Sequence, residues 1–179
     1  MEFFKKYEKE IKEIVVIHNF TKHYILLGEE LSTDFETYLQ PVKEFRDAYE
    51  HIMRIFTKCV GLNNDENSIS KDEYIKQNLS KALGHEYRAF FDVADWFSII
   101  CRKRIYDMVQ EHSYEQLCEK YPRYPEMKSR LYTISEEIAS IREKKDISSN
   151  IFDEVNRYQY ALVELLGYYR ELVDCKLIK

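Results

Sequence analysis

The sequence predicts an all-α protein: an antiparallel bundle of about five helices with one very long central helix. The chain of 179 residues holds only four Gly and three Pro, too few for the tight turns of an antiparallel sheet. No segment alternates apolar and polar residues between turn signals, as a half-buried strand would. Apolar residues instead recur three and four positions apart along most of the chain, which is typical of amphipathic helices in a bundle.

The size of the chain favours one domain. Hydrophobic residues make up 45% of the sequence, which is enough to bury a core. We therefore predict a single all-helical domain over residues 1–179. If the chain divides into two small domains, the stiff proline pair at 122–125 is where the division would fall.

The first predicted helix runs from about residue 3 to residue 31. Its apolar residues, among them Ile11, Ile14 and Ile25, follow an alternating spacing of three and four. His18 lies on the same face of this helix. We interpret it as a hydrogen-bonded core residue, because a polar ring within an apolar stripe needs a partner.

The second predicted helix has two start signals. Thr33 followed by Glu36 forms a capping box, and Pro41 kinks or restarts the helix because it lacks a backbone N–H. An apolar seam follows and ends near Gly61. This predicted seam consists of Val42, Phe45, Tyr49, Ile52, Phe56 and Cys59.

The third predicted helix is the longest. The segment 61–70 is rich in loop-forming residues, and Ser70 followed by Glu73 is a second capping box. The helix then continues to about residue 112 with Gly84 as its one breaker, a length of roughly 60 Å. Trp96 lies in its broad apolar arc, so we expect the indole to be largely buried against two other helices.

Three shorter elements complete the predicted bundle. Ser113 and Gln116 cap a short helix that ends before the proline pair. Two amphipathic helices with charged outer faces follow. Their apolar stripes are Met127, Leu131, Ile134, Ile138 and Ile141 in the first helix, and Ile151, Val155, Tyr158, Leu162, Leu165, Tyr169 and Leu172 in the second.

Composition narrows the classes of function. A formal net charge of −5 gives no overall attraction to nucleic acid or to an anionic membrane. The four cysteines are scattered without Cys-x-x-Cys spacing, which favours reduced thiols in a cytosolic protein. The charged residues within the N-terminal segment exclude a signal peptide, and no run of about 18 apolar residues could span a bilayer. We therefore expect a cytoplasmic protein that does not enter a membrane.

We expect neither a metal nor a cofactor. A di-iron bundle needs Glu-x-x-His on inward faces, but no carboxylate stands three positions before any of the five His residues. The four Gly residues are too far apart for a phosphate-binding loop. A Gly-x-Ser-x-Gly nucleophile motif is absent from the sequence.

The third predicted helix carries a polar strip that is a candidate binding site. At 100° per residue, four side chains fall within about a third of the helix circumference. These residues, the polar strip, are His85, Arg88, Asp92 and Asp95. Charged groups on so apolar a helix must face water or be paired, so two interpretations stay open. The strip is either neutralised in place, with an ion pair from Arg88 to Asp92, or it faces a cleft and binds a partner.

The second helix repeats part of this pattern. Segments 48–56 and 82–90 share Ala, His, Arg and Phe at identical offsets, a spacing typical of a helical repeat. His51 and Arg54 are therefore the counterparts of His85 and Arg88. A hairpin around the 61–70 loop would bring both histidines to a similar level, so we expect the polar strip to meet, or nearly meet, His51 and Arg54.

The sequence from Arg46 to His51 resembles the motif of the HEPN superfamily of all-helical ribonucleases. In that motif an Arg followed by a polar residue precedes a His by four to six positions, as Arg46, Asp47 and His51 do here. The resemblance implies metal-independent cleavage of RNA with Arg46 and His51 as catalytic residues. It also implies action as a homodimer in a toxin or antiviral defence system.

The absence of a catalytic motif elsewhere favours a different first hypothesis. Aromatic residues are 15% of the chain, and the predicted helices are longer than a minimal globule requires. We expect a non-enzymatic interaction or regulatory module that binds a protein partner or a second copy of itself through exposed helix faces. The ribonuclease is the alternative, and RNA is a partner only under that alternative.

Overall fold

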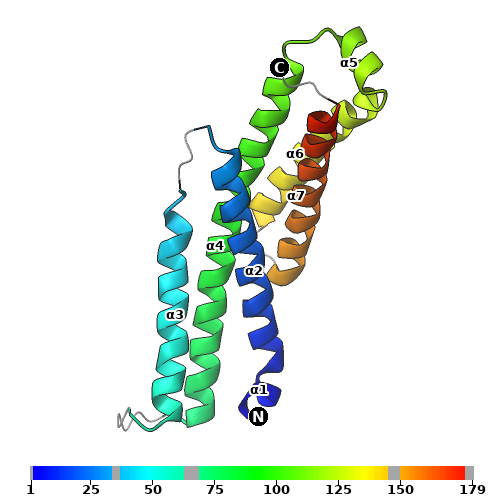
Figure 1. The fold of residues 1–179 in the computed structure, drawn as a ribbon. Coiled ribbons are helices and arrows are strands. Elements are labelled where there is room, and N and C mark those ends of the chain that lie inside the picture. Colours follow the sequence, from blue (N-terminus) through cyan, green and yellow to red (C-terminus); the bar gives the residue numbers. More distant parts are fainter. Residues whose placement is uncertain (1, 34–36, 63–68, 145–149, 176–179) are drawn as a thin grey trace. The chain divides into compact units, whose positions relative to one another are not determined.

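The structure is a computed structural model that describes residues 2–33, 37–62, 69–144 and 150–175 (Figure 1). Every regular element in these ranges is an α-helix, which confirms the predicted class. The elements are α1 (Glu2–Lys6), α2 (Glu8–Leu31), α3 (Gln40–Cys59), α4 (Lys71–Val109), α5 (Tyr114–Lys120), α6 (Tyr124–Lys144) and α7 (Ile151–Asp174). The 39-residue α4 is the predicted long helix.

The described helices form two compact units. The first unit comprises Met1–His23 and Tyr38–Val93, and the second comprises Tyr24–Thr37 and Ala94–Lys179. Both α2 and α4 contribute a segment to each unit, whereas α3 belongs to the first unit alone and α5, α6 and α7 to the second. The division therefore falls within two helices, and the proline pair at 122–125 lies inside the second unit.

The helix boundaries follow local start signals. α3 begins at Gln40 with Pro41 in its first turn, where the missing N–H has no cost. Ser70 Oγ accepts a hydrogen bond from the backbone N–H of Glu73 at 3.2 Å, and Ser113 forms a complete capping box, as predicted. The other predicted capping box includes Glu36, which lies outside the described residues.

The first unit is built around the contact of α1 and α2 with the α3–α4 hairpin. Figure 1 shows α3 running antiparallel to the beginning of α4. Four buried side chains form a core cluster there: Tyr7, Ile55, Ile75 and Leu79. The Tyr7 hydroxyl also donates a hydrogen bond to Asp72, and burial is the main reason that its pKa rises to about 12.

The second unit has a larger core. Tyr24 of α2 packs against Phe97 of α4, with ring centroids 4.8 Å apart, and Phe97 is completely buried. Trp96 is half-buried and lies against α2 at Gly28. A Cβ built on Gly28 would stand 2.0 Å from Cζ3 of the indole, so a helix glycine is required for this approach.

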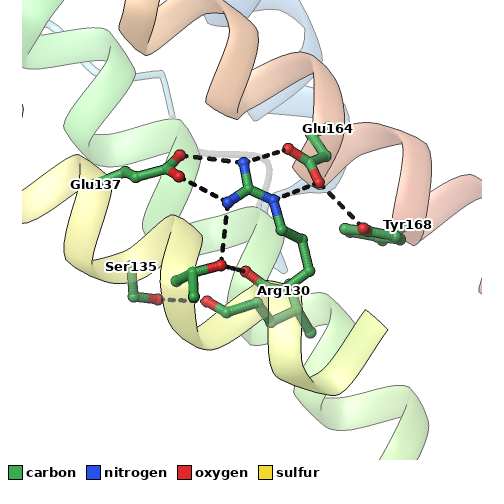
Figure 2. A network of polar contacts seen from close by, with 7 residues as sticks. Arg130, Ser135, Glu137, Glu164 and Tyr168 are labelled. Atoms are coloured by element: carbon green, nitrogen blue, oxygen red, sulfur yellow. Dashed lines mark hydrogen bonds and ion pairs between the residues drawn. The ribbon is translucent and has the colours of Figure 1, made fainter. Parts of the chain in front are cut away.

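A guanidinium connects α6 and α7 within the second unit (Figure 2). Arg130 Nε and Nη2 donate to the two carboxylate oxygens of Glu164, both at 2.8 Å, while Nη1 and Nη2 donate to Glu137 at 2.6 and 3.1 Å. Tyr168 donates to Glu164 at 3.1 Å. These bonds lower the pKa of Glu164, with the bonds from Arg130 as the main cause. The network fixes the register between the two helices.

The predicted seam of α3 faces away from the core along much of its length. The buried residues of α3 are Pro41, Ala48 and Ile55, which lie on a neighbouring face of the helix. Of the predicted seam, Phe45 and Ile52 are half-buried, and the remaining members are exposed: Val42, Tyr49, Phe56 and Cys59. The helix therefore has more apolar surface than its neighbours in the first unit cover.

Candidate functional site

The two histidines of the repeated pattern meet in the first unit. The rings of His51 on α3 and His85 on α4 are stacked, with centroids 5.5 Å apart and planes 25° from parallel. His51 Nδ1 lies 2.9 Å from Oδ1 of Asn78, so this nitrogen carries the proton and donates. Asn78 in turn donates to the carbonyl of Tyr74 at 2.9 Å. The contact holds α3 and α4 at one level.

Glu44 of α3 completes this cluster and was not singled out in the sequence. Its Oε2 accepts from Arg88 Nε at 2.9 Å and lies 2.8 Å from His85 Nδ1. His85 Nδ1 is also 2.7 Å from Arg88 Nη2, and one nitrogen cannot donate to the first group and accept from the second. We assign the proton to His85 Nδ1, because the carboxylate can only accept. Glu44 is then an anion shared by an imidazole and a guanidinium.

The electrostatics of Glu44 agree with this assignment. Burial acts to raise the pKa of the carboxyl group, but the hydrogen bonds from His85 and Arg88 outweigh it, so the net pKa lies below the ordinary value. The pKa of Asp47 is also lowered, mainly by its hydrogen bond with Arg46. This cluster is therefore a neutralised polar contact between two helices, of the kind that fixes helix register.

The residues of the polar strip belong to two units. Asp95 belongs to the second unit, where its carboxylate accepts from the Tyr158 hydroxyl at 2.6 Å and pairs with Arg142 at 3.2 Å. Burial, followed by the bond to Asp95, raises the pKa of Tyr158. Asp92 is half-buried at the end of the first unit's part of α4. The structure thus groups His85 and Arg88 with α3, and Asp95 with α6 and α7.

The remaining site residues predicted from the sequence lie on the outer side of α3. Arg46 is exposed, and its Nε and Nη2 both donate to Asp47, at 2.9 and 2.7 Å. Arg54 Nε pairs with Glu50 one turn earlier, at 3.0 Å. Arg46 and His51 therefore contact different partners within the chain.

A buried carboxylate on α4 is a further polar group that sequence reasoning missed. Glu86 is 4% exposed, and its Oε1 lies 3.2 Å from Nδ1 of His18 on α2. This hydrogen bond is the main cause of the raised pKa of His18, whose ring also packs on Phe45. Glu86 Oε2 has no hydrogen-bond partner among the described residues. A carboxylate next to a predicted polar strip gave no separate signal in the sequence.

The described residues hold no cluster suited to a metal ion. No group of three or more His, Cys, Asp or Glu side chains in those ranges could bind one.

None of the described helices combines the length and the apolar character needed to cross a bilayer.

An exposed, mainly apolar stripe runs along the outside of α3 in the first unit. Seven exposed positions follow one another at alternating intervals of three and four, beginning at the N-cap of the helix. Arg46 is the one charged member. This outer stripe consists of Leu39, Val42, Arg46, Tyr49, Met53, Phe56 and Val60. It shares three residues with the predicted seam, so the heptad spacing was visible in the sequence, but its exposure was not.

Comparison with known proteins identifies no relative of this chain. No protein-family model, no curated protein and no solved structure matches the chain. Function must therefore be inferred from the residues and contacts described above.

Proposed function

We propose that the chain is a helical interaction module that self-associates by pairing α3 with α3 of a second copy. The observation that carries this proposal is the outer stripe. Its side chains are far from buried: Leu39 is 64% exposed, Tyr49 63% and Val60 69%. Exposed apolar side chains that gather on one surface mark interaction sites, whereas scattered ones do not.

The spacing of the outer stripe favours another helix as the occupant. Alternating intervals of three and four place the side chains along a line that follows a helix seam, which is the geometry of coiled-coil pairing. The stripe runs along the whole of α3, from its N-cap Leu39 to its C-cap Val60. A partner helix of similar length would remove it from water, and burial of apolar surface is the main driving force of association.

The stripe is complementary to itself in the antiparallel direction. One register places Leu39 opposite Phe56 of the second copy, Val42 opposite Met53, and Arg46 opposite Tyr49. The first two contacts are apolar, and the third places a guanidinium against an aromatic ring, which is a favourable cation–π arrangement. The same register brings Lys43 within one turn of Glu50 of the second copy. Charge complementarity of this kind selects partner and direction.

Light scattering over a range of micromolar concentrations tests the proposal. We expect the native chain to be a dimer and the Tyr49→Glu variant to be a monomer, because a carboxylate in the middle of the stripe would lose its hydration on pairing. Tyr132→Glu is the matched control, since Tyr132 is 69% exposed on α6 and lies outside the stripe. A native chain that stays monomeric throughout, or a dimer that both variants weaken equally, would overturn the proposal.

A charge exchange tests the antiparallel register. Lys43→Glu should weaken the dimer, because the new carboxylate would face Glu50 of the second copy. Adding Glu50→Lys to the same chain should restore it, since opposite charges would again face each other. Circular dichroism must show equal helix content, because Glu50→Lys also removes the ion pair with Arg54. If the double variant associates more weakly than either single variant, the register is wrong.

The ribonuclease is a second proposal, supported by the stacked rings of His51 and His85, with Arg46 on the same helix as His51. Incubating the purified chain with RNA in the presence of a chelator tests it. Cleavage that disappears in His51→Ala and persists in His23→Ala would support the activity, because His23 is an exposed imidazole on a different helix. Intact RNA with the dimeric protein would leave the interaction module as the function.

A further inference from the structure

The second unit contains a cavity of about 560 Å³ between the end of α4, α5 and the beginning of α6. This volume is within the range of roughly 300–1,000 Å³ that is typical of small-molecule sites. All the lining residues lie between 102 and 135, within one unit, and none belongs to the outer stripe of α3. The cavity is therefore a feature separate from the proposed dimer surface.

The floor of the cavity is apolar and its rim is aromatic. Ile105, Leu117 and Met127 line the floor, and each is almost completely buried. Tyr106 and Tyr114 also line the cavity, but both are exposed. A ligand body that enters between the tyrosine rings would thus leave water for an apolar surface, which favours binding of an aliphatic or aromatic group.

The charges of the lining all have one sign. Arg102 and Lys128 contribute two cations, and among the described residues no Asp or Glu lines the cavity. Arg102 bonds to neutral acceptors only: its Nε donates to the carbonyl of Ser98 at 3.1 Å and its Nη1 to Ser135 Oγ at 3.2 Å. Lys128 Nζ lies 5.7 Å from the centre of the Tyr114 ring. Within the described ranges, neither cation has a carboxylate partner.

We propose that this cavity binds a small organic anion with an apolar body, such as a medium-chain carboxylate. The carboxylate would take the place of the missing counter-ion, with hydrogen bonds from Arg102 and Lys128 at the edge of an apolar floor. The apolar body would cover Leu117 and Met127. In a chain with a net charge of −5, a cavity without carboxylates is an unusual local environment and selects for an anion over a cation.

Titration calorimetry of the 179-residue chain tests the proposal with three ligands that have the same apolar body. Decanoate, decanol and decyltrimethylammonium, each below its micelle concentration, share a ten-carbon chain and differ only in the charge of the head group. We expect decanoate to bind most tightly, with one site per chain, and decyltrimethylammonium most weakly. Equal affinity for all three ligands, or no saturable binding of decanoate, would overturn the proposal.

Variants locate the site. Arg102→Gln should lower the affinity for decanoate by about tenfold or more, which is the effect of losing one charge-assisted hydrogen bond. The same variant should leave the affinity for decanol unchanged. Lys103→Gln, an exposed neighbour outside the cavity, is the matched control. Val109→Phe puts a larger side chain into the cavity and should lower the affinity for decanoate and for decanol alike. Tyr49→Glu should leave both affinities unchanged, so failure of the dimer proposal would not affect this result. Decanoate binding that Arg102→Gln and Val109→Phe both leave intact would overturn the assignment.

Discussion

Gly28 illustrates how one missing Cβ determines a helix contact. Ala is the better helix former by about 1 kcal/mol, but here the methyl group would overlap the indole of Trp96. We predict that Gly28→Ala lowers the free energy of unfolding by about 1–3 kcal/mol, the usual effect of overpacking. Urea denaturation followed by circular dichroism measures this change.

Gly167 is the matched control for that prediction. It lies within α7, and a Cβ added there would meet no atom within 4 Å. Gly167→Ala should therefore stabilise the protein by about 0.5–1 kcal/mol through helix propensity alone. If Gly28→Ala and Gly167→Ala both stabilise the protein, Trp96 does not pack closely against α2 at Gly28.

The pair formed by His18 and Glu86 predicts a stability that depends on pH. The pKa of His18 is raised above its ordinary value of 6.5, so the pair stabilises the fold fully below that value. The contribution is lost as the pH rises through the folded-state pKa of His18. Because the His18 side chain is 44% exposed, solvent screening limits the effect to a few tenths of a kcal/mol up to about 1 kcal/mol.

Denaturant titrations at pH 5.5 and pH 8.5 measure this dependence. His18→Gln should destabilise the protein more at the lower pH than at the higher one. His23→Gln, which alters an exposed imidazole on the same helix, serves as the control. A His18→Gln effect that is larger at pH 8.5 would contradict the sign of the argument.

At the scale of the elements, Arg130 is the main polar connection between α6 and α7. Arg130→Met would leave the carboxylates of Glu137 and Glu164 facing each other without the cation. We expect a loss of about 1–3 kcal/mol at pH 7, as for charged hydrogen bonds that are partly exposed to solvent. Arg170→Met, on the exposed side of α7, should change stability by less than about 0.5 kcal/mol.

The pH dependence of the Arg130 variant provides a second check. The pKa of Glu164 is lowered in the folded chain, so the pairing contributes above the ordinary carboxyl value of 4.5 and is lost as the pH falls through the folded-state pKa. The difference between native chain and Arg130→Met should therefore decrease below about pH 4. A constant difference down to pH 2 would mean that the methionine acts through packing instead.

The elements themselves were largely predictable from the sequence. The Ser70 and Ser113 capping boxes and the apolar periodicity predicted where α4 and α5 begin, because these signals are local. The exposure of Tyr49 and Phe56 was not predictable. Periodicity shows which face of α3 is apolar, but the presence of a covering neighbour depends on tertiary packing.

The candidate site was predictable in part. The matching offsets placed His51 and His85 at one level, and the structure stacks their rings. Glu44, the carboxylate that pairs with His85 and Arg88, has no sequence signal, because its role depends on the rotation of α3 about its own axis. Asp95 shares a helix face with His85, but its carboxylate contacts Tyr158, a residue far along the chain.

At the scale of the whole molecule, α2 and α4 each run through both units, so we predict that the units unfold in one transition. Ile55→Ala removes a buried side chain of the first unit and should cost about 2–5 kcal/mol. Hydrogen exchange followed by mass spectrometry should then show an equal loss of protection in α3 and in α7, which belong to different units. Leu172→Ala, in the second core, is the reciprocal experiment. Protection of α7 that Ile55→Ala leaves unchanged would show independent units.

The contact between Trp96 and Gly28 also makes the chain a natural optical reporter. Trp96 is its one tryptophan, and the indole lies between α2 and α4 inside the second unit. Its emission therefore shifts to longer wavelength when that contact opens to water. Tryptophan fluorescence therefore reports directly on this contact in the second unit, whereas the first unit, with its stacked histidines and the α3 surface, carries no indole of its own.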